Sequence, residues 1–141
     1  MSKKIVVAVS GGFDPIHIGH IRMFREAKKL GTKLVVILNN DNWLIKKKGF
    51  VFMNQKERKE ILESIIYVDK VFLTMHTKDT YDMSICKELK VIRPDIFANG
   101  GDRTYDNIPE VDTCKEIRCK MIFSVGGKKV QSSSWLTKNG K

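Results

Sequence analysis

Short runs of apolar residues recur along the chain, each too continuous for a half-exposed strand and too short for a helix. β-branched and aromatic side chains are frequent in these runs, as expected for strands buried on both faces of a parallel sheet. The pattern predicts five such strands, at Ile5–Val9, Leu34–Leu38, Val71–Leu73, Ile96–Ala98 and Met121–Val125.

Segments with helical periodicity lie between these runs. Apolar side chains recur in them every three or four positions, so each helix is expected to bury one face. We expect that face to include Ile18 in the first helix, Ile61 in the second and Tyr81 in the third. The four predicted helices are Ile18–Leu30, Asn54–Val68, Tyr81–Ile92 and Pro109–Ile117.

Alternation of strands and helices predicts an α/β fold in a single domain, residues 1–141. Strand–helix–strand units imply right-handed crossovers, so the sheet should be parallel and doubly wound, with helices on both faces. In such sheets a ligand binds at the carboxyl ends of the strands, where the strand order reverses. The residues that follow each strand are therefore the first candidates for a site.

Composition narrows the class of protein. The chain has 141 residues, a hydrophobic fraction of 42% and a formal net charge of +10, which favours anionic partners. Three cysteines with no Cys-x-x-Cys pair argue against a disulfide framework, and no apolar run approaches the length of a membrane span. We expect a cytoplasmic protein that neither spans a membrane nor is secreted.

The segment after the first strand, Ser10 to His20, reads SGGFDPIHIGH and carries the strongest chemical signal. Gly11 and Gly12 allow the backbone to approach a ligand closely. His17 and His20 are three residues apart at the opening of a helix, with Gly19 between them, so both rings can face the same way. Bare amides and two imidazoles at a helix N-terminus suit a phosphate group.

Zinc binding and the common nucleotide-binding motifs fit this segment less well. A His-x-x-His pair can bind zinc, yet no third and fourth ligand follows at a suitable spacing, and His76 is isolated. The segment matches neither the dinucleotide fingerprint G-x-G-x-x-G nor the P-loop. The two commonest phosphate-binding motifs are therefore excluded.

GGFDPIHIGH resembles the G-x-F-D-x-x-H-x-G-H signature of the cytidylyltransferase-like nucleotidyltransferases, which have a Rossmann-like fold. Further segments that resemble the family in the same order are Glu57-Arg58, Tyr67–Val71, Arg93–Phe97 with Asn99–Asp102, and Gln131–Leu136. The chain departs from the family at Ile66, where an arginine is usual, and at Lys128 and Lys129, where an arginine often precedes the serine-rich signature.

The resemblance implies transfer of a nucleoside monophosphate from CTP or ATP to a phosphorylated small molecule, with Mg²⁺ bound to the triphosphate and release of pyrophosphate. A phosphate monoester is mostly dianionic at neutral pH, because its second pKa is about 6. No strong general base is then required, and stabilising charge at the α-phosphate is the main task.

By resemblance, the catalytic residues are His17, His20 and one lysine of the run after the second strand, for which we take Lys46. The nucleotide-binding residues are Gly11, Gly12, Phe13, Asp14, Gly19, Gly100, Asp102, Ser132, Ser133 and Ser134. Asp14 also has the alternatives of orienting the turn or helping to hold Mg²⁺. The acceptor-binding residues are Trp43, Lys47, Lys48 and Arg58.

Two of these assignments rest on local expectations. The lysine run is expected to lie in a flexible loop, and the sequence does not decide which of its three lysines is catalytic. Arg58 has Asn54 and Leu62 as its helical neighbours four residues away, so no carboxylate on its own helix pairs with it. That absence favours a functional role for Arg58.

The acceptor and the base stay open at this point. A sugar or polyol phosphate is favoured, with glycerol 3-phosphate as a specific alternative, and CTP and ATP are equally compatible. A basic nucleic-acid-binding module is the alternative from another class, although the lysines lack the interleaved aromatic residues typical of one. A homodimer is expected from the resemblance.

Overall fold

The structure is a computed structural model that describes residues 3–100 and 109–126. Its core is a five-stranded, all-parallel sheet with the order β3-β2-β1-β4-β5, which confirms the predicted Rossmann-like α/β class. The strands are β1 (Val6–Gly11), β2 (Lys33–Leu38), β3 (Lys70–Leu73), β4 (Ile96–Ala98) and β5 (Lys120–Ile122). Each predicted strand is therefore present, with its ends shifted by a few residues at most.

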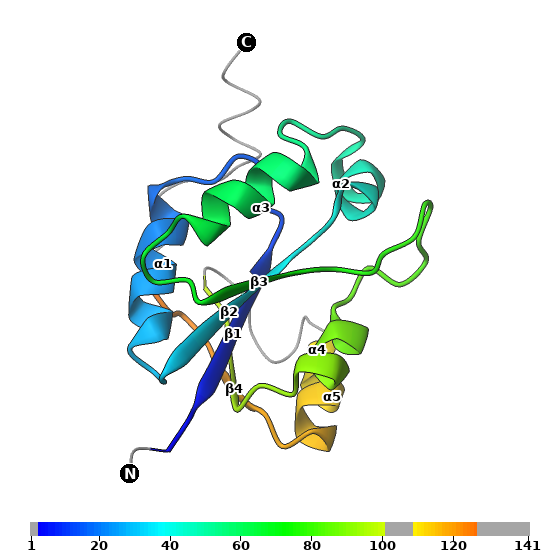
Figure 1. Cartoon of the computed structure of the whole chain (residues 1–141). Helices are drawn as coiled ribbons and strands as arrows, with labels where there is room; N and C mark the ends of the chain where they lie inside the picture. Colours follow the sequence, from blue (N-terminus) through cyan, green and yellow to red (C-terminus); the bar gives the residue numbers. More distant parts are fainter. Residues whose placement is uncertain (1–2, 101–108, 127–141) are drawn as a thin grey trace.

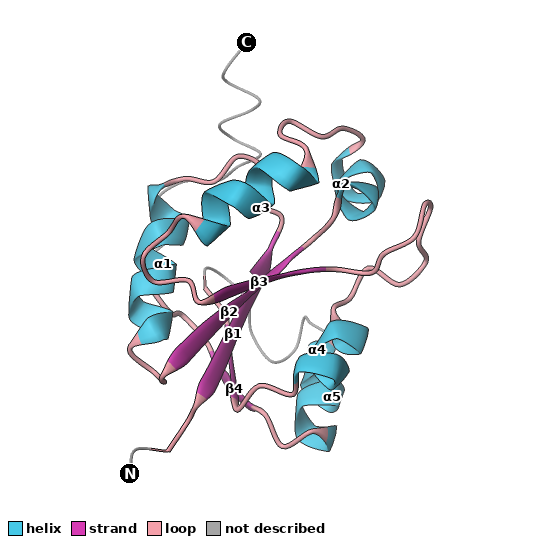
Figure 2. Cartoon of the chain, in the orientation of Figure 1, coloured by secondary structure: helices cyan, strands magenta, loops and turns pink. Residues whose placement is uncertain are grey.

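Helices cover both faces of the sheet (Figures 1 and 2). They are α1 (Ile18–Lys28), α2 (Asp41–Lys48), α3 (Gln55–Glu63), α4 (Cys86–Ile92) and α5 (Glu110–Glu116). In Figure 1, α1 and α3 lie on one side of the strands, and α4 and α5 lie on the other. None of the helices in the described ranges is long and apolar enough to cross a membrane.

Alternation along the strands divides the core into two clusters. Leu38 packs with Phe24 of α1 and Leu62 of α3 in one cluster. The adjacent Ile37 packs with Leu89 of α4 in the other cluster, on the opposite face. Adjacent residues of a strand point to opposite faces, so both faces of β2 are buried under helices. This explains the continuous apolar run from Leu34 to Leu38.

The strand order reverses beside β1, which pairs with β2 on one side and with β4 on the other. Successive connections leave the sheet toward opposite faces at such a point, so loops diverge there and leave room for a ligand. β1 ends at Gly11, directly before the glycine-rich segment. The topology thus places the segment with the strongest chemical signal at the expected ligand position.

The lysine run is not a flexible loop, and this expectation was wrong. Residues Asp41–Lys48 form α2, because the Asn40 side chain caps the helix by accepting from the Trp43 N–H, and Gly49 ends it in a left-handed conformation. The cap and stop residues were visible in the sequence. The run of three lysines hid the helix, because it resembles a solvated loop.

Two helix boundaries and three burial predictions were also wrong. α4 begins at Cys86, because Asp82 accepts from the backbone and side chain of Ser84 and forms a turn instead of a first helical turn. α3 ends at Glu63 rather than at Val68. Three of the apolar residues that the predicted helical faces would have buried are instead exposed: Ile18, Ile61 and Tyr81.

Candidate active site

His17 and His20 cap α1 with their own side chains. His17 is the N-cap residue, and its Nδ1 accepts from the Gly19 N–H at 3.1 Å. Nδ1 of His20 accepts in return from the His17 N–H, also at 3.1 Å. This reciprocal arrangement is a capping box formed by two imidazoles, and it fixes both rings at the helix N-terminus.

Those two hydrogen bonds also fix where each ring carries its proton. A neutral imidazole has one protonated nitrogen, and an Nδ1 that accepts a hydrogen bond leaves the proton on Nε2. The rings stack with their centroids 3.8 Å apart and an angle of 25° between their planes. Two Nε2–H donors therefore stand side by side where the helix dipole favours an anion.

His20 is held in its neutral form. Burial lowers its pKa from 6.5 to about 3, and the positive charges of His17 and Lys48 act in the same direction. An imidazole with this pKa donates from Nε2 across the physiological range without becoming a cation. Its contribution to anion binding is therefore a directed hydrogen bond rather than a full charge.

Gly19 and Phe13 provide the space and support for the pair. A Cβ at Gly19 would lie 2.9 Å from the His17 ring, so a side chain there would displace that imidazole. The Phe13 ring packs edge-on against His20, with centroids 4.8 Å apart, and against Phe24 of the core. Phe13 has a left-handed backbone with a φ of 51°, which is costly for an aromatic residue and is common at functional turns.

Asp14 anchors the loop between α2 and α3 to this turn. Its two carboxylate oxygens accept from the backbone N–H groups of Phe52, at 2.7 Å, and Met53, at 2.6 Å. The side chain is buried. These contacts support the alternative that Asp14 orients the turn.

Arg58 belongs to the scaffold beneath the site. Its side chain is fully buried and donates to the carbonyl oxygens of Gly12, Asn39 and Met53 at 2.6–2.9 Å. Nη2 pairs with Asp41 of α2 at 2.6 Å. As expected, no carboxylate of its own helix pairs with Arg58, but Asp41 of another helix does, so the inference of a functional role from a missing partner does not hold. This geometry argues against direct contact between Arg58 and an acceptor.

The lysine run has one member directed at the site. Lys48 is half-buried, whereas Lys46 and Lys47 are exposed. Burial lowers the pKa of Lys48, the Asp14 carboxylate opposes that shift and Arg58 adds to it, so Lys48 lies within electrostatic reach of both. Lys48 also lowers the pKa of His20. The structure therefore points to Lys48 rather than Lys46 as the lysine beside the histidines.

The other predicted residues lie in four places. Gly11 and Gly12 lie at the end of β1, and a Cβ at Gly12 would lie 3.4 Å from the Trp43 ring. The Trp43 indole donates to the Met83 carbonyl at 2.9 Å, so it is held against the chain beside that turn. Gly100 lies just beyond β4. Outside the described residues lie Asp102, Ser132, Ser133 and Ser134.

A polar network at the ends of β2 and β3 was missed. Asn40 donates from its side chain to the carbonyl oxygens of Thr74 and His76, at 3.1 and 2.8 Å. His76 is itself hydrogen bonded to the Thr74 hydroxyl and the Ser84 carbonyl, which makes it a satisfied buried histidine. The Asn39-Asn40 pair directly after an apolar run was the signal in the sequence for a polar strand end.

No group of three His, Cys, Asp or Glu side chains that could hold a metal ion occurs within residues 3–100 and 109–126. Asp14, whose oxygens each accept one backbone N–H, is not part of such a group. An octahedral Mg²⁺ ion commonly keeps waters and takes phosphate oxygens as ligands, so it would enter with a triphosphate.

These features define a class: a Rossmann-like α/β protein with a stacked histidine pair at a helix N-terminus beside the switch point of its sheet. Residues 8–134 match the family model described as Cytidylyltransferase-like. The chain belongs to this family, and it is a nucleotidyltransferase; the resemblance drawn from the sequence is confirmed.

Similar proteins carry more specific names. The FAD synthase of Pyrococcus horikoshii is 35% identical over 120 residues, which cover 84% of this chain and 73% of that protein. The bifunctional protein HldE of Nitratiruptor sp. is 33% identical over 89% of this chain but only 26% of its own length. A lipopolysaccharide core biosynthesis protein from Thermoplasma volcanium superposes with a TM-score of 0.69 at 25% identity, covering 86% of this chain and 97% of that one.

Replacing Arg58 with Met should lower the free energy of unfolding by on the order of 3 kcal/mol, because three buried carbonyl oxygens and Asp41 lose their donor. Urea denaturation measures the loss. Lys59→Met is the matched control, since it removes the same charge from an exposed position of α3. Equal, small effects of the two substitutions would contradict the scaffold role.

The pKa of His20 predicts a specific dependence of stability on pH. Between 6.5 and about 3 the unfolded chain binds a proton at this residue and the folded chain does not, so stability falls as the pH decreases through that window. His20→Gln should reduce the slope by up to about 1.4 kcal/mol per pH unit. Denaturation curves from pH 7.5 to 4.5 measure it. An NMR titration of the ligand-free His20 ring with a midpoint near 6.5 would overturn the prediction.

Proposed function

We propose that this nucleotidyltransferase is an adenylyltransferase: it transfers AMP from ATP to the phosphate of a phosphomonoester, with flavin mononucleotide as the first candidate acceptor. The observation that carries the reaction class is the stacked pair of histidines at the N-terminus of α1, each with its Nδ1 accepting a backbone N–H and its Nε2 left to donate. Similarity to the FAD synthases supports ATP and the flavin phosphate.

In the proposed reaction, an oxygen of the acceptor phosphate attacks the α-phosphorus of ATP. A new phosphorus–oxygen bond forms, the bond to the bridging oxygen between the α- and β-phosphates breaks, and pyrophosphate leaves with the electron pair. His17 and His20 donate hydrogen bonds from Nε2 to the α-phosphate oxygens, where charge builds up in the transition state. Mg²⁺ bound to the triphosphate neutralises part of its charge.

Lys48 brings the acceptor phosphate to this position. A partly buried ammonium group attracts a phosphate dianion more strongly than the exposed Lys46 and Lys47 do, because less water screens it. Loss of its own hydration is the main reason its pKa is lowered, and an arriving phosphate would offset that loss. Lys46, the lysine favoured from the sequence, lies on the same helix but is exposed.

A sugar phosphate is the second candidate acceptor. Similarity to HldE, and to a lipopolysaccharide core biosynthesis protein at the level of structure, favours it. Neither the FAD synthases nor HldE supports the glycerol 3-phosphate alternative. CTP in place of ATP has no support from these named relatives, and a homodimer stays a prediction.

The proposal is tested by mixing the protein with Mg²⁺, α-labelled ATP or CTP, and one acceptor at a time: flavin mononucleotide, a heptose or hexose phosphate, and glycerol 3-phosphate. Labelled FAD and pyrophosphate are the expected products. His17→Asn and His20→Asn should each lower kcat about a hundredfold or more, because each removes one donor to the transition state. Among the lysines, only Lys48→Ala should raise the acceptor KM markedly, with Lys46→Ala and Lys47→Ala as matched controls.

Three results would contradict the proposal. Products from CTP but not from ATP would reject the adenylyl donor. Full turnover in either histidine variant would reject its role at the α-phosphate. A loss in Lys46→Ala that Lys48→Ala does not show would return the lysine role to the more exposed residue.

A further inference from the structure

Two buried oxygen atoms at the carboxyl end of the sheet lack hydrogen-bond partners. They are Oδ1 of Asn39 and Oε1 of Glu88, the only unpartnered buried side-chain nitrogen or oxygen atoms among the described residues. Asn39 is 5% exposed and Glu88 is 2% exposed. A buried acceptor without a donor costs roughly 1–3 kcal/mol, so two of them at one end of the sheet require an explanation.

Backbone hydrogen bonds place the two residues at neighbouring strand ends. Asn39 directly follows β2, and its N–H donates to the Gly11 carbonyl of β1 at 2.9 Å. Thr74 directly follows β3, and its N–H donates to the Leu38 carbonyl at 2.9 Å. Glu88 accepts through Oε2 from the N–H of Met75, the next residue, also at 2.9 Å.

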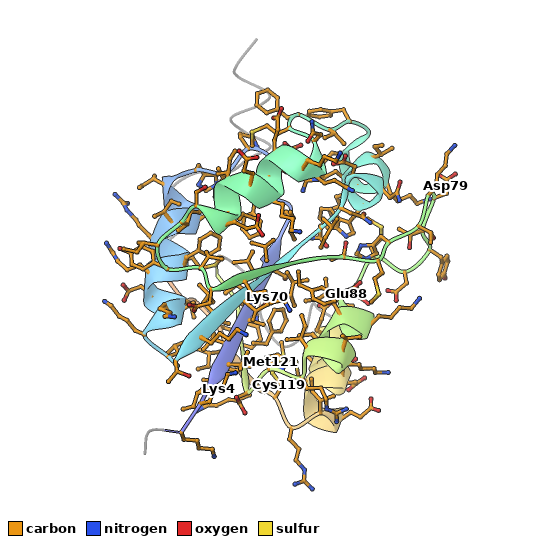
Figure 3. All side chains as sticks on the ribbon, in the orientation of Figure 1. Lys4, Lys70, Asp79, Glu88, Cys119 and Met121 are labelled. Atoms are coloured by element: carbon orange, nitrogen blue, oxygen red, sulfur yellow. The ribbon has the colours of Figure 1, made fainter. Side chains whose placement is uncertain are left out.

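Both side chains belong to the α4 side of the sheet. Ile37, two residues before Asn39, packs in the core cluster that contains Leu89 of α4. Alternation along the strand therefore directs Asn39 to the same face. In Figure 3, Glu88 lies where α4 approaches the strands. Asn39 therefore lies next to Gly11 at the start of the glycine-rich turn, and Glu88 lies beside Met75 after β3, both on the face of the sheet away from α1.

The chemistry of the pair selects a neutral hydrogen-bond donor. An amide oxygen and a carboxylate oxygen accept hydrogen bonds, and the carboxylate repels a phosphate. The phosphates are instead attracted to the histidine pair and Lys48. A phosphorylated acceptor therefore fits the site in one orientation, with its phosphate toward the histidines and its hydroxyl or ring N–H groups toward Asn39 and Glu88.

We propose that Asn39 and Glu88 bind the phosphate-free part of the acceptor through its hydroxyl or N–H donors and so determine which acceptor is used. This rests on the proposed function for the acceptor's phosphate, but the two residues contact a different part of the molecule. The ribityl chain and ring N–H of flavin mononucleotide carry such donors, as does a sugar phosphate. Removing or reversing a buried acceptor should discriminate strongly between acceptors with and without a matching donor.

Glu88→Gln is the decisive substitution. The amide oxygen can still accept from the Met75 N–H, while an NH₂ group replaces Oε1 and meets the ligand's donor with another donor. The acceptor KM should rise about tenfold or more, with little change in the KM for ATP. Asn39→Ala should also raise the acceptor KM, by removing the second oxygen.

Glu110→Gln is the matched control. Glu110 is 3% exposed, lies on α5 of the same face, and accepts from the Ile85 N–H at 3.2 Å, but it has no unpartnered buried oxygen. Its substitution should leave the acceptor KM unchanged. Unfolding of each variant is followed in parallel, so that a loss of folded protein is not mistaken for a loss of binding.

Assays with different acceptor molecules identify which of their groups donates the hydrogen bond. They also distinguish this inference from the proposed transferase function. Flavin mononucleotide, its N3-methyl derivative and a hexose phosphate are each assayed for transfer and, without nucleotide, for binding by equilibrium dialysis. Weak binding of the N3-methyl derivative alone would assign the contact to the ring N–H, and equal binding of both flavins would assign it to the hydroxyl groups.

Transfer with an unchanged acceptor KM in both Glu88→Gln and Asn39→Ala would overturn the inference and leave the transferase function intact; water would then satisfy the two oxygens. Without transfer, acceptor binding that Glu88→Gln weakens would support the inference although the proposed reaction had failed. Absence of both transfer and binding would overturn the two together.

Discussion

The buried guanidinium of Arg58 joins segments that are far apart in the sequence: the turn after β1, the end of β2, the start of α2 and the loop before α3. Asp14 completes the connection by holding that loop from the other side. Backbone carbonyls just after a strand have no ladder partner, so a fully buried cation that donates to two of them, and to a third carbonyl in the loop before α3, stabilises an otherwise unfavourable geometry. We call the contacts of Arg58 and Asp14 the junction. The positions of the histidine turn and of Lys48 both depend on it.

The junction also separates two kinds of recognition. On the α1 side, the neutral imidazole of His20, the stacked ring of His17 and a partly desolvated ammonium group offer hydrogen-bond donors to phosphate oxygens. On the α4 side, Asn39 and Glu88 offer only acceptors at their unpartnered oxygens. Charge therefore orients a phosphorylated molecule before any shape complementarity acts. Membership of the family indicates the reaction class. In our proposal, the unpartnered oxygens on the α4 side require an acceptor that carries hydrogen-bond donors.

Sequence reasoning reached the parts of the molecule that depend on local pattern. Continuous apolar runs marked the strands, and the spacing of His17 and His20 marked the two rings that stack at the start of α1. It failed where residues distant in the chain decide the outcome: Arg58 finds its carboxylate on another helix, and Tyr81 lies in a turn although the periodicity predicted a buried helical face. The unpartnered oxygen of Glu88 had no signal at all, because burial of a carboxylate is a property of tertiary packing.

We propose that the imidazoles of His17 and His20 donate hydrogen bonds from Nε2 to the α-phosphate of ATP. The most direct test is ¹⁵N NMR of the protein with labelled histidines, titrated with Mg²⁺ and an ATP analogue that resists α–β cleavage. We predict that His17 and His20 keep Nδ1 unprotonated and that both Nε2–H resonances shift downfield as the analogue saturates the site. Saturable binding that leaves both Nε2 resonances unchanged, or a proton on Nδ1 in the free protein, would contradict the account.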